Sequence, residues 1–336
     1  MRASPSSAAP VLRSHYILPM SWTDDANLSE LVDYVDTLTP FVDVIVVDGS
    51  PEPLRTRHRS SFSHPITVID CNVALAPNGK VAGIHTALPL LRWKHTIIAD
   101  DDVRYSPADL RHVLTALETC ELAVPQNIFT SAHRRRLPWH AKWDTARSLI
   151  NRAFAADYPG TLAVRTDVLL PGYDGDVLFE NLELMRTVLA RGGRVRSVSD
   201  CYVDRRPPSA RAFLSQRVRQ AYDSRAQPQR WVVELALAPL ILLLVRKPRR
   251  LLLAAVLSVV LAEAGRRRAA GRTVYSADSA LWAPLWLTER AVCSWIALGS
   301  ALRGGALYRG RRFRTSAHSL RTLRSLEKET SRVETR

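Results

Sequence analysis

The sequence predicts an α/β fold with a mainly parallel central sheet, followed by a C-terminal helical region that associates with a membrane. Strand and helix patterns alternate over the first hundred residues, acidic residues follow two of the predicted strands, and long apolar segments appear after residue 225. Strands that alternate with helices form parallel sheets with right-handed crossovers. A chain of 336 residues is long enough to bury a sizeable core, in one large domain or two smaller ones.

Four β-branched or apolar runs are typical of strands, and two segments with apolar residues at helical spacing connect them. In the first helix, Leu28, Leu31 and Val35 recur three or four residues apart and share one face. In such a sheet, ligands bind beyond the carboxyl ends of the strands. The predicted elements are a strand at 15–20, a helix at 26–38, strands at 41–48 and 66–70, a helix at 82–91 and a strand at 93–98.

Three consecutive carboxylates, Asp100 to Asp102, follow the last of these strands. Adjacent carboxylates repel one another and are costly to bury unpaired, and Mg²⁺ or Mn²⁺ makes such a cluster tolerable. Alternate residues of an extended segment share a face, so Asp100 and Asp102 can point the same way. Asp48 ends an earlier strand, and we expect one pocket to hold it together with the three aspartates. The alternative is an acidic strand end that caps the following helix.

Three short motifs follow one another along the chain: Val46-Val47-Asp48-Gly49-Ser50, Asn78-Gly79-Lys80 and the aspartate run at 100–102. Their order resembles that of the inverting family 2 glycosyltransferases of the GT-A fold. Further along, 158–165 resembles the loop and strand near the acceptor, and 179–184 resembles the acidic pair that opens a helix. Residues 216–220 resemble the Gln-x-x-Arg-Trp motif, with Gln220 where Trp is usual. The resemblance covers residues 14–225.

The resemblance implies a donor site, a metal ligand and an acceptor region. Asp48 would bind the base or ribose, Asp102 would ligate Mg²⁺ or Mn²⁺ on the diphosphate, and Gly160 and Thr161 would lie near the acceptor. Trp139 and His140, an aromatic and a histidine nearby in the chain, are further candidates for the acceptor pocket, or are solvated. The residues expected to bind the nucleotide or donor are Pro19, Asp48, Gly49, Lys80, Asp100, Asp101, Gln216 and Arg219.

The catalytic base is expected at the start of the helix near 180. Asn181 stands where the family has the Asp that acts as base, and an amide does not accept a proton at pH 7. Glu180 is therefore the first candidate, and Glu183, one turn further on, is the second. The alternative is that these acids only stabilise a helix N-terminus.

The function predicted from these residues is metal-assisted transfer of a hexose with inversion, in which a carboxylate deprotonates the acceptor hydroxyl. The donor would be a nucleotide diphosphate sugar, most simply a UDP-sugar, and the acceptor a lipid, a lipid-linked sugar or a glycan. One alternative is a catalytically silent, membrane-bound nucleotide-sugar-binding protein, which Asn181 keeps open. Another is a sugar nucleotidyltransferase, disfavoured because residues 19–24 contain no glycine for a phosphate loop.

Charge and hydropathy after residue 225 predict contact with an anionic membrane surface. The net charge of +15 is concentrated in separate basic clusters, three of which flank apolar segments. The segments 231–245 and 251–262 are shorter than the roughly 20 residues of a spanning helix, so a shallow re-entrant hairpin is favoured over a tilted two-span hairpin. Residues 281–302 resemble an interfacial helix with tryptophans at headgroup level. The alternative is a small soluble helical domain. No nucleic-acid-binding motif is present.

The spacing of the cysteines and the composition of the N-terminal stretch predict the cellular compartment of the protein. Cys71, Cys120, Cys201 and Cys293 form no C-x-x-C pair, and scattered thiols fit a reducing environment. The N-terminal stretch has no apolar core of a signal peptide. We therefore expect the protein at the cell membrane, with its catalytic domain in the cytoplasm. The predicted divisions are a disordered N-terminus at 1–13, a GT-A glycosyltransferase domain at 14–225, membrane-associating helices at 226–312 and a charged tail at 313–336.

Overall fold

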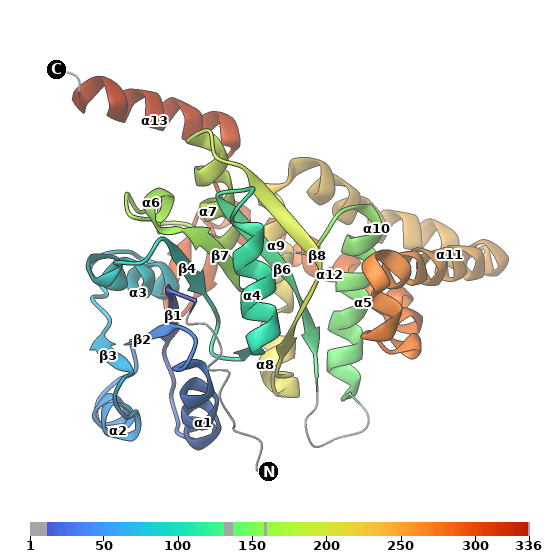
Figure 1. Cartoon of the computed structure of the whole chain (residues 1–336). Helices are drawn as coiled ribbons and strands as arrows, with labels where there is room; N and C mark the ends of the chain where they lie inside the picture. Colours follow the sequence, from blue (N-terminus) through green and yellow to red (C-terminus); the bar gives the residue numbers. More distant parts are fainter. Residues whose placement is uncertain (1–11, 131–136, 158–159, 335–336) are drawn as a thin grey trace, which may run out of the picture.

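The computed structural model describes residues 12–130, 137–157 and 160–334. It shows a central sheet with helices on both faces and a group of helices at one side (Figure 1). The predicted α/β class and helical C-terminal region are thereby confirmed. The predicted disordered N-terminus lies outside the described residues, apart from its last two positions.

Among the described residues, eight strands form one sheet in the order β3-β2-β1-β4-β7-β6-β8-β5. The neighbours β3, β2, β1 and β4 are all parallel, and so are β6 and β8, whereas β7 is antiparallel to both of its neighbours and β5 is antiparallel to β8. The strands are β1 (Ser14–Met20), β2 (Asp43–Asp48), β3 (Thr67–Asp70), β4 (His95–Ile98), β5 (Val103–Arg104), β6 (Leu122–Phe129), β7 (Leu162–Arg165) and β8 (Val195–Arg205).

Alternating side chains of the strands supply two hydrophobic layers. Tyr16 and Leu18 of β1 face α1 (Leu28–Leu38) and α4 (Pro107–Ala116), whereas Ile17 faces α3 (Gly79–Ala87) and α7 (Glu180–Ala190). The predicted first four strands and the two helices between them are all present. The shorter helical segments are α2 (Leu54–Ser61), α6 (Thr166–Leu169), α8 (Ala210–Ser215), η1 (Leu88–Leu90), η2 (Ser224–Ala226), η3 (Arg268–Thr273) and η4 (Ala277–Trp282).

The C-terminal helices pack on the sheet domain at the side away from β2 and β3 (Figure 1). Helix α11 lies on α5, and α12 lies between α9 and α10. In the part of the chain that the structure describes, α10 alone is long and apolar enough to cross a membrane, and only 6% of it is buried. The elements are α5 (Trp139–Phe154), α9 (Arg217–Asp223), α10 (Pro228–Val245), α11 (Pro248–Arg267), α12 (Ala283–Leu302), β9 (Ala306–Tyr308), β10 (Arg311–Phe313) and α13 (Leu320–Glu334).

Helix α12 differs from the predicted interfacial helix. Trp286 is 3% exposed and packs in a core with Leu149 and Ala262, so this tryptophan cannot lie at headgroup level. Trp295 is half exposed and donates a hydrogen bond to the carbonyl of Leu235, 3.0 Å away. Helices α5, α9 and α10 pack against α12. The buried face of α12 therefore contacts other parts of the protein.

A buried chain of charges joins these helices to the sheet domain. Arg217 lies 3.1 Å from Asp144 and 3.7 Å from Glu289. Arg290, the next residue of α12, lies 4.0 Å from Glu289 and 4.0 Å from Glu234 of α10. Removing one partner of such a pair leaves a buried charge uncompensated, so the network holds α9, α10 and α12 in register.

Candidate active site

A cleft opens at the carboxyl ends of β1 and β4 and consists of two adjoining hollows. The two hollows share five lining residues, which come from the loop after β4, from α7, from β8 and from the α8–α9 segment: Asp100, Glu180, Arg205, Gln216 and Arg219. The aspartate hollow is also lined by Pro19, Asn78, Lys80, Asp101, Asp102 and Arg309. The arginine hollow is also lined by Arg147, Gly160, Asn181, Asp223, Gln227 and Arg230.

Lys80 lies at the centre of the cleft. Asn78 caps α3 by accepting a hydrogen bond from the Lys80 backbone N–H at 3.0 Å, which positions the lysine at the helix start. The Lys80 Nζ lies 2.6 Å from Asp100 Oδ1 and 3.2 Å from Glu180 Oε1. Burial would lower the pKa of Lys80, but these two carboxylates outweigh it and the pKa lies above its ordinary value. Lys80 is therefore a fixed positive charge between Asp100 and Glu180.

Gly160 completes the environment of Lys80. Its carbonyl oxygen accepts a hydrogen bond from Lys80 Nζ at 2.9 Å. A Cβ on residue 160 would lie 1.6 Å from Asp100 Oδ2, far inside van der Waals contact. Close approach of the backbone to the Asp100 carboxylate thus requires glycine at this position.

Substitution of Gly160 by alanine is expected to displace Asp100 and to lower the free energy of unfolding by about 1–3 kcal/mol, the usual cost of overpacking. Urea denaturation measures this loss. Gly79→Ala is the matched control, because Gly79 lines the same cleft and a Cβ there meets nothing within 4 Å. Equal losses in the two variants would mean that the contact with Asp100 is not limiting.

Asp101 and Asp102 are held differently. Asp101 accepts a hydrogen bond from the Trp22 indole, and Asp102 Oδ2 lies 2.9 Å from Arg205 Nε. The other oxygen of Asp102, Oδ1, is buried and has no hydrogen-bond partner among the described residues. Burial raises the pKa of Asp102, while the Arg205 charge acts in the opposite direction. An unpaired, buried carboxylate oxygen at the floor of a cleft is a fitting ligand for Mg²⁺ or Mn²⁺.

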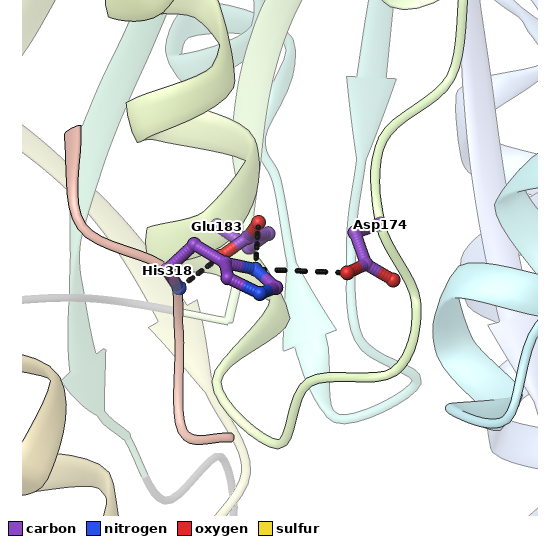
Figure 2. A group of neighbouring side chains, drawn as sticks. All are labelled: Asp174, Glu183 and His318. Atoms are coloured by element: carbon purple, nitrogen blue, oxygen red, sulfur yellow. Dashed lines mark hydrogen bonds and ion pairs between the residues drawn. The ribbon is translucent and has the colours of Figure 1, made fainter. Parts of the chain in front are cut away.

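The metal would need further oxygen ligands from a substrate. Within the described ranges, the one group of three metal-ligating side chains that converge is Asp174, Glu183 and His318, whose ligand atoms lie within 4.8 Å of one another. None of these three residues lines either hollow. Figure 2 shows their side chains pointing toward one another. Diphosphate oxygens usually complete a magnesium site that has only one or two carboxylates.

Glu183 is buried and already occupied. Its Oε2 accepts a hydrogen bond from the His318 backbone N–H at 2.7 Å, and its Oε1 lies 2.9 Å from His318 Nδ1 (Figure 2). Asp174 Oδ2 lies 3.6 Å from the same nitrogen. Because Glu183 is 0% exposed and lines neither hollow, the structure places this predicted second base where it fastens the C-terminal segment to α7.

Asp48 and Gly49, predicted for the donor site, also lie outside the cleft. Asp48 is 0% exposed and accepts hydrogen bonds from His58 Nδ1 at 2.7 Å and from the Ser50 backbone N–H at 2.8 Å. The expected shared pocket therefore contains the three aspartates without Asp48. The reason is α2, an unpredicted polar helix that carries His58 over the end of β2. Gly49 donates its backbone N–H to Met20 at 2.8 Å.

The predicted acceptor residues are only partly in the cleft. Gly160 lines the arginine hollow, but Thr161 is buried and donates a hydrogen bond to the carbonyl of Ile98 at 2.7 Å. Trp139 and His140 pack against Phe213, and His140 Nε2 donates to the carbonyl of Pro208 at 2.7 Å. They line neither hollow. Asn181 does line the arginine hollow, and its oxygen accepts from Lys80 Nζ at 3.3 Å.

Several charged residues of the cleft were not predicted from the sequence. Arg205 ends β8, Asp223 ends α9, and Arg309 follows β9. Arg309 lies in the region 226–312 that was expected to associate with a membrane, yet it donates a hydrogen bond to the Ser21 carbonyl at 3.2 Å and lines the aspartate hollow. Arg205 ends a strand of the central sheet, and this position at a strand end is the signal that could have identified it.

No protein-family model and no curated protein matches this chain. Among solved structures, a mannosyltransferase from Pyrobaculum calidifontis, in complex with GDP-Man and Mn²⁺, is similar over 99% of this chain and 84% of its own, with 15% identity and a TM-score of 0.47. Glucosyl-3-phosphoglycerate synthase from Mycobacterium tuberculosis is similar over 60% of this chain and 74% of its own, with 15% identity and a TM-score of 0.40. Mannosyl-3-phosphoglycerate synthase from Rubrobacter xylanophilus is similar over 61% and 70%, with 16% identity and a TM-score of 0.40. Because these identities and TM-scores are low, the comparisons carry no argument about function. The function proposed below is argued from the residues of the cleft.

Proposed function

We propose that this protein is a glycosyltransferase that moves a hexose from a nucleotide diphosphate sugar to an acceptor hydroxyl, with inversion and with the assistance of a divalent metal. The observation that carries the proposal is the cleft itself. Its aspartate hollow combines an acidic run at a strand end, four cationic side chains and a further carboxylate: the residues are Asp100, Asp101, Asp102, Lys80, Arg205, Arg219, Arg309 and Glu180.

The aspartate hollow is the proposed donor site. Asp102 would hold Mg²⁺ or Mn²⁺ through its unpaired Oδ1, and such an ion, when bound, supplies neutralising charge to the departing diphosphate. Arg219 and Arg309 line the same hollow and are fixed cations for the same phosphates. The first base or ribose contact would have to come from the end of β1, where Pro19 and Met20 line the hollow.

The reaction we propose is one displacement at the anomeric carbon. The acceptor oxygen forms a bond to that carbon, and the bond from the carbon to the diphosphate oxygen breaks with its electron pair going to the leaving group. A carboxylate of the cleft takes the acceptor proton, and Glu180 is the one that the sequence indicates. A displacement without a covalent intermediate inverts the anomeric centre.

A lipid or lipid-linked acceptor is proposed from the position of α10. Gln227 precedes this helix and Arg230 lies in its first turn, and both line the arginine hollow. The same helix then exposes apolar side chains such as Val233 and Leu242. A membrane that received this face would bring lipid headgroups next to the arginine hollow, and the catalytic domain would lie on the cytoplasmic side.

Calorimetric titration of the full chain with UDP, GDP and dTDP, with and without Mn²⁺, tests the proposal. We expect one nucleotide to bind with an affinity that Mn²⁺ increases, because the phosphates complete the ligand set of the ion. The preferred nucleotide also identifies the donor class. Absence of binding to all three under every metal condition would contradict the proposal. Binding without any turnover of the matching sugar nucleotide would instead support the silent binding protein that Asn181 suggests.

A further inference from the structure

Asp223 is a carboxylate of the arginine hollow that the proposed reaction has not yet used. It is the last residue of α9, one helical turn after Arg219, and both side chains line that hollow. Its Oδ1 is buried and has no hydrogen-bond partner among the described residues. Its carboxylate also forms no salt bridge with any described residue. An unpaired buried oxygen is unusual and indicates a group held ready for a ligand.

The carboxylates around Lys80 and Arg205 are, by contrast, engaged with cations. Glu180 lies 3.2 Å from Lys80 Nζ, and Asp100 lies 2.6 Å from the same atom. Asp102 is paired with Arg205 at 2.9 Å. Glu180 is therefore already occupied by its ion pair with Lys80.

The remaining candidates near α7 are also unsuitable. Asn181 has an amide that does not accept a proton, and Glu183 is closed off by His318 (Figure 2). Asp223 is the carboxylate of the arginine hollow that has neither defect.

The proton affinity of Asp223 suits a base at neutral pH. Burial raises its pKa to about 6. The Arg219 charge opposes this shift, the Glu180 charge adds to it, and Arg290 and Arg230 oppose it from the neighbouring helices α12 and α10. Above pH 6 the carboxylate is mostly ionised and still binds a proton more readily than an ordinary aspartate.

We propose that Asp223 is the catalytic base that removes the proton of the acceptor hydroxyl, while Glu180 remains paired with Lys80. The inference rests on the proposed glycosyltransferase function and deepens it. The proton passes from the acceptor oxygen to Asp223 Oδ1, the freed electron pair forms the new bond to the anomeric carbon, and the diphosphate leaves with the electron pair of the broken bond. The acceptor therefore binds in the arginine hollow, with the donor in the aspartate hollow.

Asp223→Asn tests this assignment with water as the acceptor. The probes are UDP-glucose and GDP-mannose with Mn²⁺ and the full chain, and the measurement is the release of UDP or GDP. We expect turnover to fall about 100-fold or more, the usual contribution of a general base. The affinity for the nucleotide should stay unchanged. The wild-type rate should rise with pH through about 6 as the Asp223 carboxylate ionises, and this limb should vanish in the variant.

Rescue by azide distinguishes a variant that has lost only its catalytic base from a variant whose site is misfolded. Azide is an anionic nucleophile with no proton to remove, so it should restore nucleotide release in Asp223→Asn and yield a glycosyl azide. A variant that is merely misfolded would not be rescued. Asp33→Asn, at an exposed position of α1, is the matched control and should behave as wild type.

The variant Glu180→Gln tests the competing assignment, in which Glu180 is the base. Azide rescue of Glu180→Gln, together with full turnover in Asp223→Asn, would assign the base to Glu180 and overturn the inference. Normal turnover in Asp223→Asn would by itself overturn the assignment of Asp223 as the base. Turnover by the unaltered protein would still support the proposed glycosyltransferase function. If the unaltered protein binds no nucleotide or releases none from either donor, the proposed function fails, and the assignment of Asp223 fails with it.

Discussion

Replacement of Asp102 by asparagine is expected to remove the Mn²⁺ dependence of nucleotide binding and to weaken that binding about 100-fold. Asparagine keeps the shape of the side chain but loses the negative charge and one of the two acceptor oxygens. In the unaltered protein, Asp102 Oδ1 is buried without a hydrogen-bond partner and is the proposed ligand of the ion. A 100-fold loss corresponds to about 2.8 kcal/mol, within the range that a metal contributes to charge stabilisation. Calorimetric titration in the presence and absence of Mn²⁺ measures both effects.

The same substitution also leaves Arg205 without its carboxylate partner, so folding has to be checked by circular dichroism. Asp36→Asn is the control, because Asp36 is exposed on α1 and lies outside the cleft. A titration of Asp102→Asn in Mn²⁺ that superimposes on the wild-type curve would show that another group holds the ion.

The first part of the sheet was predictable because its signals are local. β-Branched runs and apolar residues three or four apart define β1, α1, β2 and β4 without knowledge of the rest of the chain. The resemblance to GT-A glycosyltransferases put both Lys80 and Asp100 among the expected donor-binding residues, and in the structure both line one cleft.

The remainder of the site depends on contacts between distant segments. Asp48 was expected in the cleft because it ends a strand, but His58 reaches it from a helix whose sequence, Leu-Arg-Thr-Arg-His-Arg-Ser-Ser, carries almost no apolar pattern. Arg309 enters the cleft from β9, nearly three hundred residues after the Ser21 carbonyl that it contacts. Neither pairing leaves a periodic signal in the sequence.

Local composition also cannot distinguish a lipid from a protein neighbour. Trp286 and Leu242 both lie in apolar segments, yet Trp286 is buried against α5 and α11, whereas Leu242 is 73% exposed. Only the packing of α12 on α5 and α11 separates the two environments. The prediction that the tryptophans of α12 lie at headgroup level is therefore wrong for Trp286. The apolar hairpin formed by α10 and α11, in contrast, keeps an exposed apolar face.

Polar substitutions on this uncovered face are expected to abolish binding to membranes. Leu242 and Leu243 of α10 and Leu252 of α11 are 73%, 70% and 66% exposed, so glutamine at the three positions should not disturb the folded protein. Each leucine that enters a bilayer contributes at least about 1.5 kcal/mol, so the triple variant should bind vesicles roughly 1000-fold more weakly. Flotation with phosphatidylcholine vesicles, with and without phosphatidylserine, measures the binding.

The comparison variant carries glutamine at Leu75, Leu170 and Leu214, which are 48%, 47% and 54% exposed on the sheet domain. It removes the same number of leucines, so a loss of flotation confined to the hairpin variant assigns the contact to α10 and α11. Binding should be stronger with phosphatidylserine, because residues 246–250 carry four basic side chains at the turn between these helices, each worth about 1 kcal/mol near an anionic surface. If the wild-type chain stays with the soluble fraction for both vesicles, the argument for a lipid-linked acceptor loses its support. Unchanged Mn²⁺-dependent nucleotide binding in the hairpin variant would show that the donor site functions independently of the membrane contact.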